Sequence, residues 1–183
     1  MEEQVRELND FQKAFRDKEL REGIELVSQD ILEEEEEDVD TQHGRYMTFK
    51  IDGEYYGIAI TYVSEIIGIQ QITELPETPE YIKGLINLRG KIVPILDVRL
   101  RFEKPEAEYD DRTCVIVTNV GEDTVGLVVD TIADVVSIED ENILEPPSVR
   151  NSAANHYICG YGKIGDEVKL IIDPAKLIYE QEQ

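Results

Sequence analysis

Part of this chain occurs twice. Residues 57–69 match residues 126–138 at an offset of 69, and residues 81–97 match residues 157–173 at an offset of 76. Self-similarity at a fixed spacing indicates duplicated structural units. The chain should therefore fold into two related halves. A feature that is present in only one half is not needed to build the unit.

Short apolar runs alternate with turn residues in each half. Asp52-Gly53 separates two such runs and is a strong signal for a two-residue hairpin turn. Arg89-Gly90 separates residues 82–88 from residues 91–96 in the same manner. The pattern predicts about five short strands in each half, with little helix.

Many short strands with regular turn signals favour small barrels over a β-α-β sheet. We expect a mostly β fold, with a first barrel over about 44–103 and a second over about 112–180, joined by a polar connector. A barrel that closes on itself leaves no exposed sheet edge. The seam between two barrels would be a natural docking groove.

The hairpin over residues 82–97 has features that its counterpart lacks. Arg89 occupies the tip, where a turn usually has Asn or Asp, and Pro94 lies within a strand, where it cannot donate to the ladder. The second half has Gly165-Asp166 at the tip and Leu170 in place of the proline. Apolar side chains fall on both faces of residues 91–96, so one face should be covered by this chain or by a partner.

An acidic arm precedes the predicted barrels. Residues 1–40 hold 16 acidic and 5 basic residues, and residues 33–38 are all acidic. Val5, Leu8 and Phe15 follow helical spacing. We expect residues 1–43 to form a partly helical or disordered arm, which is either a solvated segment or an amphipathic docking helix tethered by the acidic run.

Composition excludes several classes of function. The net charge of -23 and the sequence pI of about 4.3 disfavour binding to nucleic acid or to an anionic membrane. No apolar run approaches the ~20 residues of a membrane span. The N-terminus has no signal pattern, so we expect the chain to stay in the cytoplasm. There, Cys114 and Cys159 should be reduced rather than bridged.

The residues give no indication of catalysis. His43 and His156 stand alone in polar surroundings, and no spacing of His and Cys fits zinc. Residues 160–165 match the dinucleotide-binding glycine pattern, but a strand-like run follows them instead of the required helix. We expect no enzyme, no cofactor and no metal. A binding module fits best; a small-molecule-binding or hydrolytic barrel, or activity residing in the arm, are the alternatives.

Several of these runs resemble the bacterial chemotaxis coupling protein family CheW. The most specific is Asn-Leu-Arg-Gly-Lys-Ile-Val-Pro at 87–94, and the match covers about residues 44–180 in order. The other matching runs are residues 49–58, 63–67, 82–99 and 125–136. The resemblance implies two intertwined five-stranded SH3-like barrels without catalytic activity. CheV is similar but carries a receiver domain, so we expect the stand-alone adaptor.

The family resemblance also implies partners. These are the regulatory domain of the histidine kinase CheA and the cytoplasmic tips of methyl-accepting chemoreceptors, in arrays at the membrane. It implies a partner-binding surface of six residues: Val63, Glu65, Ile66, Gly84, Arg89 and Gly90. Val63 and Ile66 would anchor a receptor helix or belong to the core. Arg89 would pair with a partner or brace its own hairpin, and the glycines would permit the backbone geometry.

Overall fold

The computed structural model describes residues 42–146 and 152–180. The chain divides into residues 1–43 and 44–183, and the described residues belong almost entirely to the second unit. The predictions made for the acidic arm lie outside the described residues, apart from Gln42 and His43. Within the described part, no helix is long and apolar enough to cross a membrane.

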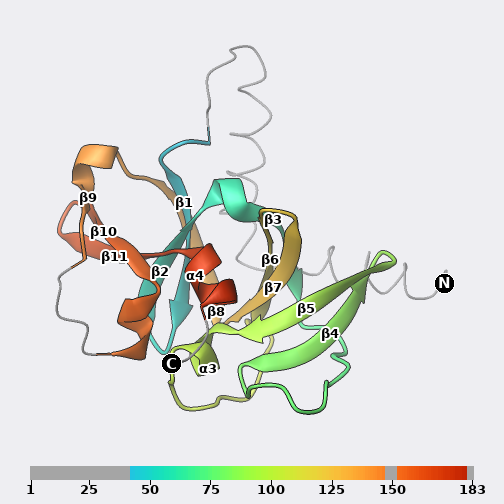
Figure 1. Cartoon of the computed structure of the whole chain (residues 1–183). Helices are drawn as coiled ribbons and strands as arrows, with labels where there is room; N and C mark the ends of the chain where they lie inside the picture. The colour runs from blue at the N-terminus through green and yellow to red at the C-terminus, as the bar shows by residue number, and fades with distance from the viewer. Residues whose placement is uncertain (1–41, 147–151, 181–183) are drawn as a thin grey trace, which may run out of the picture. The chain divides into compact units, whose positions relative to one another are not determined.

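The described residues are mostly β, and the predicted fold class is confirmed (Figure 1). The first half contains β1 (Arg45–Ile51), β2 (Glu54–Ala59), the 3-10 turn η1 (Ile60–Tyr62), β3 (Val63–Gly68), β4 (Ile82–Leu88), β5 (Lys91–Asp97) and α3 (Val98–Arg101). The second half contains β6 (Cys114–Val120), β7 (Asp123–Val129), β8 (Thr131–Ser137), η2 (Asp140–Asn142), β9 (Ile143–Leu144), η3 (Ala153–His156), β10 (Ile158–Ile164), β11 (Glu167–Ile172) and α4 (Pro174–Tyr179).

The two halves exchange their first hairpins. A six-stranded sheet has the order β8-β1-β2-β11-β10-β9, and a five-stranded sheet has the order β3-β6-β7-β5-β4. Hairpin β1–β2 therefore belongs to the sheet that the second half completes, and β6–β7 belongs to the sheet that the first half completes. The parallel pairs β2–β11 and β5–β7 join the donated hairpins to their hosts. The expected ranges 44–103 and 112–180 thus mark the sequence halves and not the two sheets.

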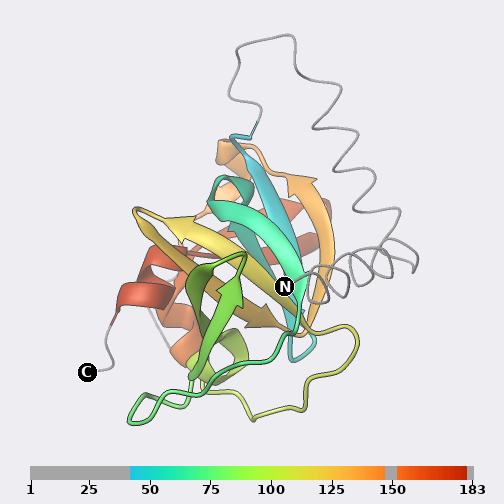
Figure 2. The same cartoon turned by 90° about the vertical axis from the view of Figure 1, so that its right-hand side faces the viewer.

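Each sheet curls so that its first and last strands are neighbours along the chain. Beyond β3 the chain returns to β4 through one bridge, with hydrogen bonds of 2.8 Å in both directions between the backbones of Thr73 and Leu85. In the other sheet, β9 follows β8 along the chain and pairs with β10, with Leu144 opposite Tyr161. Neither sheet is closed by a full ladder of hydrogen bonds, but each has a barrel-like strand order. Figure 2 views this arrangement from the side of the β4–β5 hairpin.

The repeated aspartates begin the two helices. The Asp97 carboxylate accepts a hydrogen bond from the Leu100 N–H at 3.1 Å, and the Asp173 carboxylate accepts one from the Ala175 N–H at 2.9 Å. Such caps satisfy N–H groups that have no partner within the helix. The duplicated Asp is therefore explained by helix capping.

The core of the five-stranded sheet is aliphatic. Its eight buried members are Ile67, Ile86, Leu88, Val93, Ile95, Val115, Val117 and Val128. A separate aromatic chain runs from Phe49 and Tyr56 in the six-stranded sheet through Phe102 to Tyr157, with ring centroids 5.0–6.1 Å apart. Ring packing of this kind adds to the stability gained from burial.

Candidate functional site

The tip of the β4–β5 hairpin has an unusual backbone. Arg89 has φ +52° and Gly90 has φ +86°, so both turn residues are left-handed. Gly90 adopts this conformation readily, whereas a residue with a Cβ is disfavoured there by about 1–2 kcal/mol. The Gly90 N–H donates to the Asn87 side-chain oxygen at 2.8 Å, which fixes the turn. Arginine at this position therefore needs a compensating interaction.

Arg89 reaches back to β3 and binds Glu65 with both ends of its guanidinium. Nη1 donates to Oε1 at 2.8 Å, and Nη2 donates to Oε2. These hydrogen bonds and the charge of Glu65 raise the pKa of Arg89. The Arg89 side chain remains 56% exposed and the Glu65 side chain 23% exposed, so water screens the pair. Exposed pairs contribute only ~0.2–1 kcal/mol to stability.

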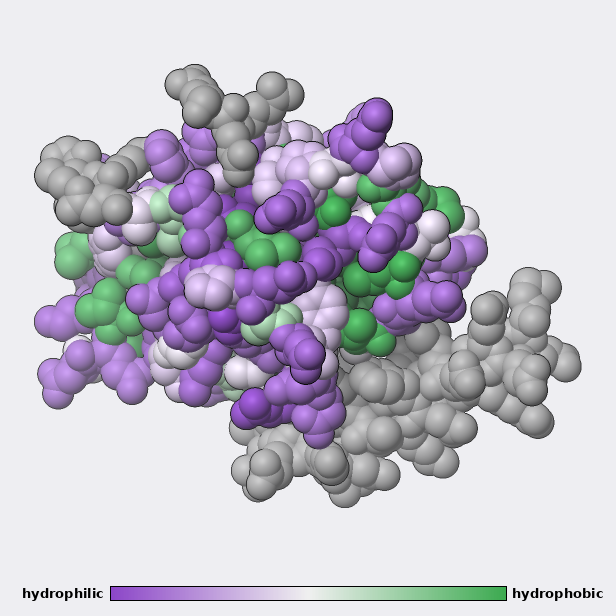
Figure 3. Space-filling model, turned by 90° about the horizontal axis from the view of Figure 1, so that it is seen from below, coloured by the Kyte–Doolittle hydropathy of each residue, from purple (hydrophilic) through white to green (hydrophobic). Residues whose placement is uncertain are grey.

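Apolar side chains lie on the same two elements. Val63 and Ile66 in β3 are half-buried, so neither belongs wholly to the core or wholly to the surface. Ile92, which follows the tip in β5, is 57% exposed. On the lower surface of the molecule, which Figure 3 shows, apolar residues form separate patches among hydrophilic residues.

Gly84 serves the fold directly. Its φ is +138°, and a Cβ added there would lie 2.1 Å from the Thr73 carbonyl oxygen. The glycine therefore admits the segment that returns to β4. Of the two glycines in the predicted surface, Gly84 is enclosed by backbone, while nothing lies within 4 Å of a Cβ built at Gly90.

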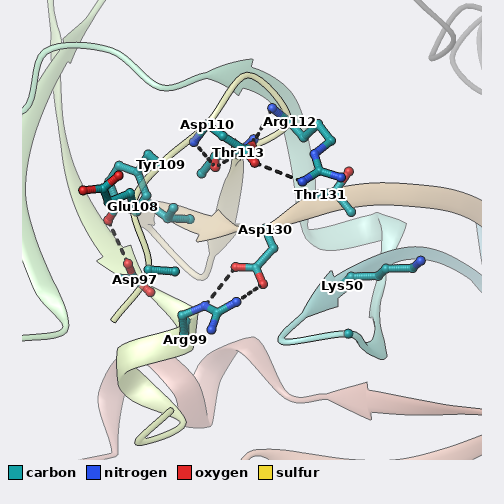
Figure 4. Close-up of a pocket in the computed structure, with 13 residues that line it drawn as sticks. Lys50, Asp97, Arg99, Glu108, Tyr109, Asp110, Arg112, Thr113, Asp130 and Thr131 are labelled. Carbon is teal, nitrogen blue, oxygen red and sulfur yellow. Dashed lines mark hydrogen bonds and ion pairs between the residues drawn. The ribbon is translucent and has the colours of Figure 1, made fainter. Parts of the chain in front are cut away.

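A polar cavity of about 250 Å³ lies where the halves meet (Figure 4). Among its lining residues is Arg99, which donates from Nε to the Asp130 carboxylate at 3.2 Å and from Nη1 to the Asp52 carboxylate at 3.2 Å. Tyr109 donates its hydroxyl to Asp97 at 2.7 Å, and burial together with this bond raises its pKa. These groups satisfy one another, which suits a structural junction better than acid–base catalysis.

The described residues contain no group of three His, Cys, Asp or Glu side chains that could hold a metal ion. Cys114 is buried, and burial raises the pKa of its thiol to about 11. Cys159 is exposed as a residue, but partial desolvation of its thiol raises the pKa as well, and so does the charge of nearby Asp173. A raised pKa disfavours the thiolate that nucleophilic catalysis requires.

The structure brings five of the six predicted site residues to β3 and the hairpin tip: Val63, Glu65 and Ile66 on β3, and Arg89 and Gly90 at the tip. The sixth, Gly84, lies against the segment that returns to β4. Glu65 and Arg89 were both predicted from the sequence, but their pairing was not, because no local pattern links residues that lie far apart along the chain. The role of Asn87 was not predicted either, although Asn before a Gly-containing turn is a recognised turn signal.

Comparison with known proteins places the fold among characterised proteins. The family model for the CheW-like domain matches residues 45–182. Chemotaxis protein CheW of Klebsiella aerogenes is 41% identical over 137 residues, which cover 75% of this chain and 82% of that protein. CheW of Treponema pallidum is 32% identical over 79% of this chain and 87% of that protein. The crystal structure of the scaffolding protein TtCheW from Thermoanaerobacter tengcongensis superposes with a TM-score of 0.70 at 32% identity, covering 74% of this chain and 92% of that one.

Proposed function

Since this chain belongs to the CheW family, we propose that it couples the histidine kinase CheA to transmembrane chemoreceptors. Members of the family are chemotaxis scaffolds and not enzymes. In this proposal the chain binds the regulatory domain of CheA and the cytoplasmic tips of the receptors. It acts in the cytoplasm and is recruited to receptor arrays at the membrane.

The observation that carries the proposal is the bidentate pair between Arg89 and Glu65 at an exposed hairpin tip. The tip is strained at Arg89, and the second half builds the same hairpin with Gly165 in its place. Strain that the fold does not require is commonly associated with function. Exposed Ile92 next to the tip adds apolar surface that a partner would bury.

We assign the partner surface to Val63, Glu65, Ile66, Gly84, Arg89 and Gly90. Val63 and Ile66 are the apolar anchors for a receptor helix, because half-buried side chains retain area to lose on binding. Arg89 supplies the charged contact, and Glu65 holds it in place until the partner binds. Gly84 and Gly90 act through the backbone, by admitting the returning segment and the left-handed turn.

The proposal is tested by co-sedimentation with CheA and receptor-bearing membranes. Arg89→Ala should lower the apparent affinity about 10-fold or more, as expected for a central interface arginine. Arg112→Ala is the matched control, since Arg112 is also an exposed arginine paired with a carboxylate, in this case Asp110. Equal losses in the two variants, or unfolding of the Arg89 variant, would contradict the assignment.

A charge exchange separates a partner contact from an internal brace. The double variant Glu65→Arg with Arg89→Glu restores an ion pair between β3 and the tip of the β4–β5 hairpin. If Arg89 contacts the partner, binding stays impaired although the pair is restored. Recovery of binding in the double variant would show that the pair acts only by holding the hairpin.

A further inference from the structure

Arg101 is a buried cation at the end of α3. Only 1% of its surface is exposed. Its Nε donates to the Leu177 carbonyl at 3.0 Å, and its Nη2 donates to the Glu180 carbonyl. Both acceptors lie at the C-terminal end of α4, where helix carbonyls lack partners within the helix. One side chain thus joins the helix that follows the five-stranded sheet to the helix that follows the six-stranded sheet.

The guanidinium also lies against two tyrosine rings. Its central carbon is 4.2 Å from the ring centroid of Tyr81 and 4.9 Å from that of Tyr157. Cations at this distance from an aromatic ring are attracted to it, more strongly when water is excluded. The two tyrosines are counterparts in the repeat, and each accepts a 2.7 Å backbone hydrogen bond, from Asp97 and from Asp173 respectively.

This arrangement places Arg101 where the two halves meet. At the offset of 76 its counterpart is Leu177, whose side chain is fully buried and whose carbonyl receives the Arg101 Nε. Equivalent positions of the two halves therefore contact one another. One arginine is enough for this contact, which explains why the second half has leucine and not arginine at the equivalent position. Burying a charge is costly, and a buried apolar side chain is often at least as stabilising.

A second observation indicates what the arginine contributes. Within residues 42–146 and 152–180, the chain crosses from one sheet to the other at two places, over Ile60–Tyr62 and at Asp130, the single residue between β7 and β8. Two covalent connections alone would let one sheet rotate relative to the other about the line that joins the two crossing points. Hydrogen bonds of Arg99 to Asp52, of Tyr179 to the Val120 carbonyl and of Arg101 to α4 oppose this rotation. Among these three, the bond from Arg101 Nε to the Leu177 carbonyl is the buried one.

We propose that Arg101 is the positioning residue that fixes the orientation of the two sheets, and that this orientation is required when kinase and receptor are held together. The second part rests on the proposed function, because a scaffold that joins two partners transmits their relative geometry through its own body. The first part does not depend on any partner.

The orientation is measured by double electron–electron resonance between spin labels at two exposed turns, after Glu122→Cys and Asp166→Cys, with exposed Cys159 replaced by serine. Glu122 lies in the turn between β6 and β7 of the five-stranded sheet, and Asp166 lies in the turn between β10 and β11 of the six-stranded sheet. The parent should give one narrow distance distribution. Arg101→Met keeps an unbranched apolar side chain but has no hydrogen-bond donors. It should at least double the width of the distance distribution or change its mean distance.

The functional readout compares binding to each partner alone with assembly of the three-component complex. With Arg101→Met, affinity for CheA alone and for receptor membranes alone should change less than twofold, while assembly of the three-component complex falls about 10-fold or more. A variant that is merely destabilised would lose all three in parallel. Leu100→Met, a half-exposed neighbour on α3, serves as the control and should leave all measurements unchanged.

Several outcomes overturn the inference. A broad distance distribution in the parent, or an unchanged one in a folded Arg101→Met variant, removes the positioning role. If Arg101→Met does not fold, Arg101→Lys tests the same point, because an ammonium cannot replace the planar, doubly donating guanidinium. If the parent binds neither partner, the proposed function fails, and the distance measurement still decides the positioning role.

Discussion

In the five-stranded sheet, Val117 packs among aliphatic side chains, whereas its counterpart Thr48 in the six-stranded sheet is a buried hydroxyl. Thr48 donates to the Asp134 carbonyl at 2.9 Å and accepts from the Asp134 N–H at 3.0 Å. Val93 is matched in the same way by Lys169, which is only 7% exposed. The ladders correspond strand for strand although their interiors differ.

The difference teaches that strand pairing, more than core composition, is what the duplicated halves share. Lys169 is accommodated by a 2.7 Å ion pair with Glu167 and by the Tyr55 ring, whose centroid lies 3.8 Å from its Nζ. Each buried polar group in the six-stranded sheet thus has a specific partner. The five-stranded sheet has an aliphatic core cluster, and its one buried strand threonine, Thr118, donates to the Val125 carbonyl at 2.8 Å. This sheet also bears the strained, exposed tip that we assign to partner binding.

The largest difference should come from the paired glycines that admit the returning segments. Gly84→Ala places a Cβ against the Thr73 backbone at a positive φ, and should lower the free energy of unfolding by about 3 kcal/mol or more. Gly160→Ala meets the Ile143 side chain at 2.8 Å, with no positive φ, and should cost about 1–2 kcal/mol. Urea unfolding of both variants measures this, and equal losses would contradict the assigned role of the Thr73 bridge.

An exchange of interior residues should have the next largest effect. Thr48→Val leaves the Asp134 backbone groups without their partner, and Val117→Thr buries a hydroxyl among aliphatic side chains. Each should cost about 1–3 kcal/mol in the free energy of unfolding. Ser64→Ala, at an exposed position of β3, is the control. If either interior variant is neutral, the two cores are interchangeable and the contrast between the sheets is lost.

Acid should loosen the six-stranded sheet before the five-stranded one. The hydrogen bond and charge of Lys169 lower the pKa of Glu167. A lowered folded-state pKa stabilises the fold above the unfolded-state pKa of about 4.3, and this contribution is lost as the pH falls through the folded-state value. Hydrogen-exchange protection of β10 and β11 should therefore fall, relative to that of β4 and β5, as the pH drops below the unfolded-state pKa. Glu167→Gln should remove this pH dependence; its persistence would point to other carboxylates.

The smallest effect on stability should come from replacing Arg89, at the tip of the β4–β5 hairpin, by the glycine that its counterpart Gly165 provides in the β10–β11 hairpin. Arg89→Gly removes an exposed ion pair worth ~0.2–1 kcal/mol but also relieves a left-handed residue, so the unfolding free energy should change by less than about 1 kcal/mol. Partner binding should fall as it does for Arg89→Ala. A large loss of stability would instead show that Arg89 is required by the fold.

Much of the secondary structure could be predicted from local sequence patterns. Asp52-Gly53 and Arg89-Gly90 marked two hairpin turns, and the alternation around them gave β4 and the neighbouring strands nearly to the residue. The exchange of hairpins could not be derived from such patterns, because they identify strands and not their partners. The intertwined arrangement was expected only from the family resemblance. The contact between Arg101 and the repeated tyrosines likewise joins residues that no local pattern relates.

The exchanged hairpins have a consequence for synthesis on the ribosome. β1 and β2 emerge early, but Tyr56 pairs with Leu170 near the other end of the chain, and β8 also appears only in the second half. The early hairpin must wait with unsatisfied edges while most of the protein is translated, a delay that favours mispairing. A nascent chain of this topology is therefore most vulnerable just before its last strand is released, and neither half alone can complete a sheet.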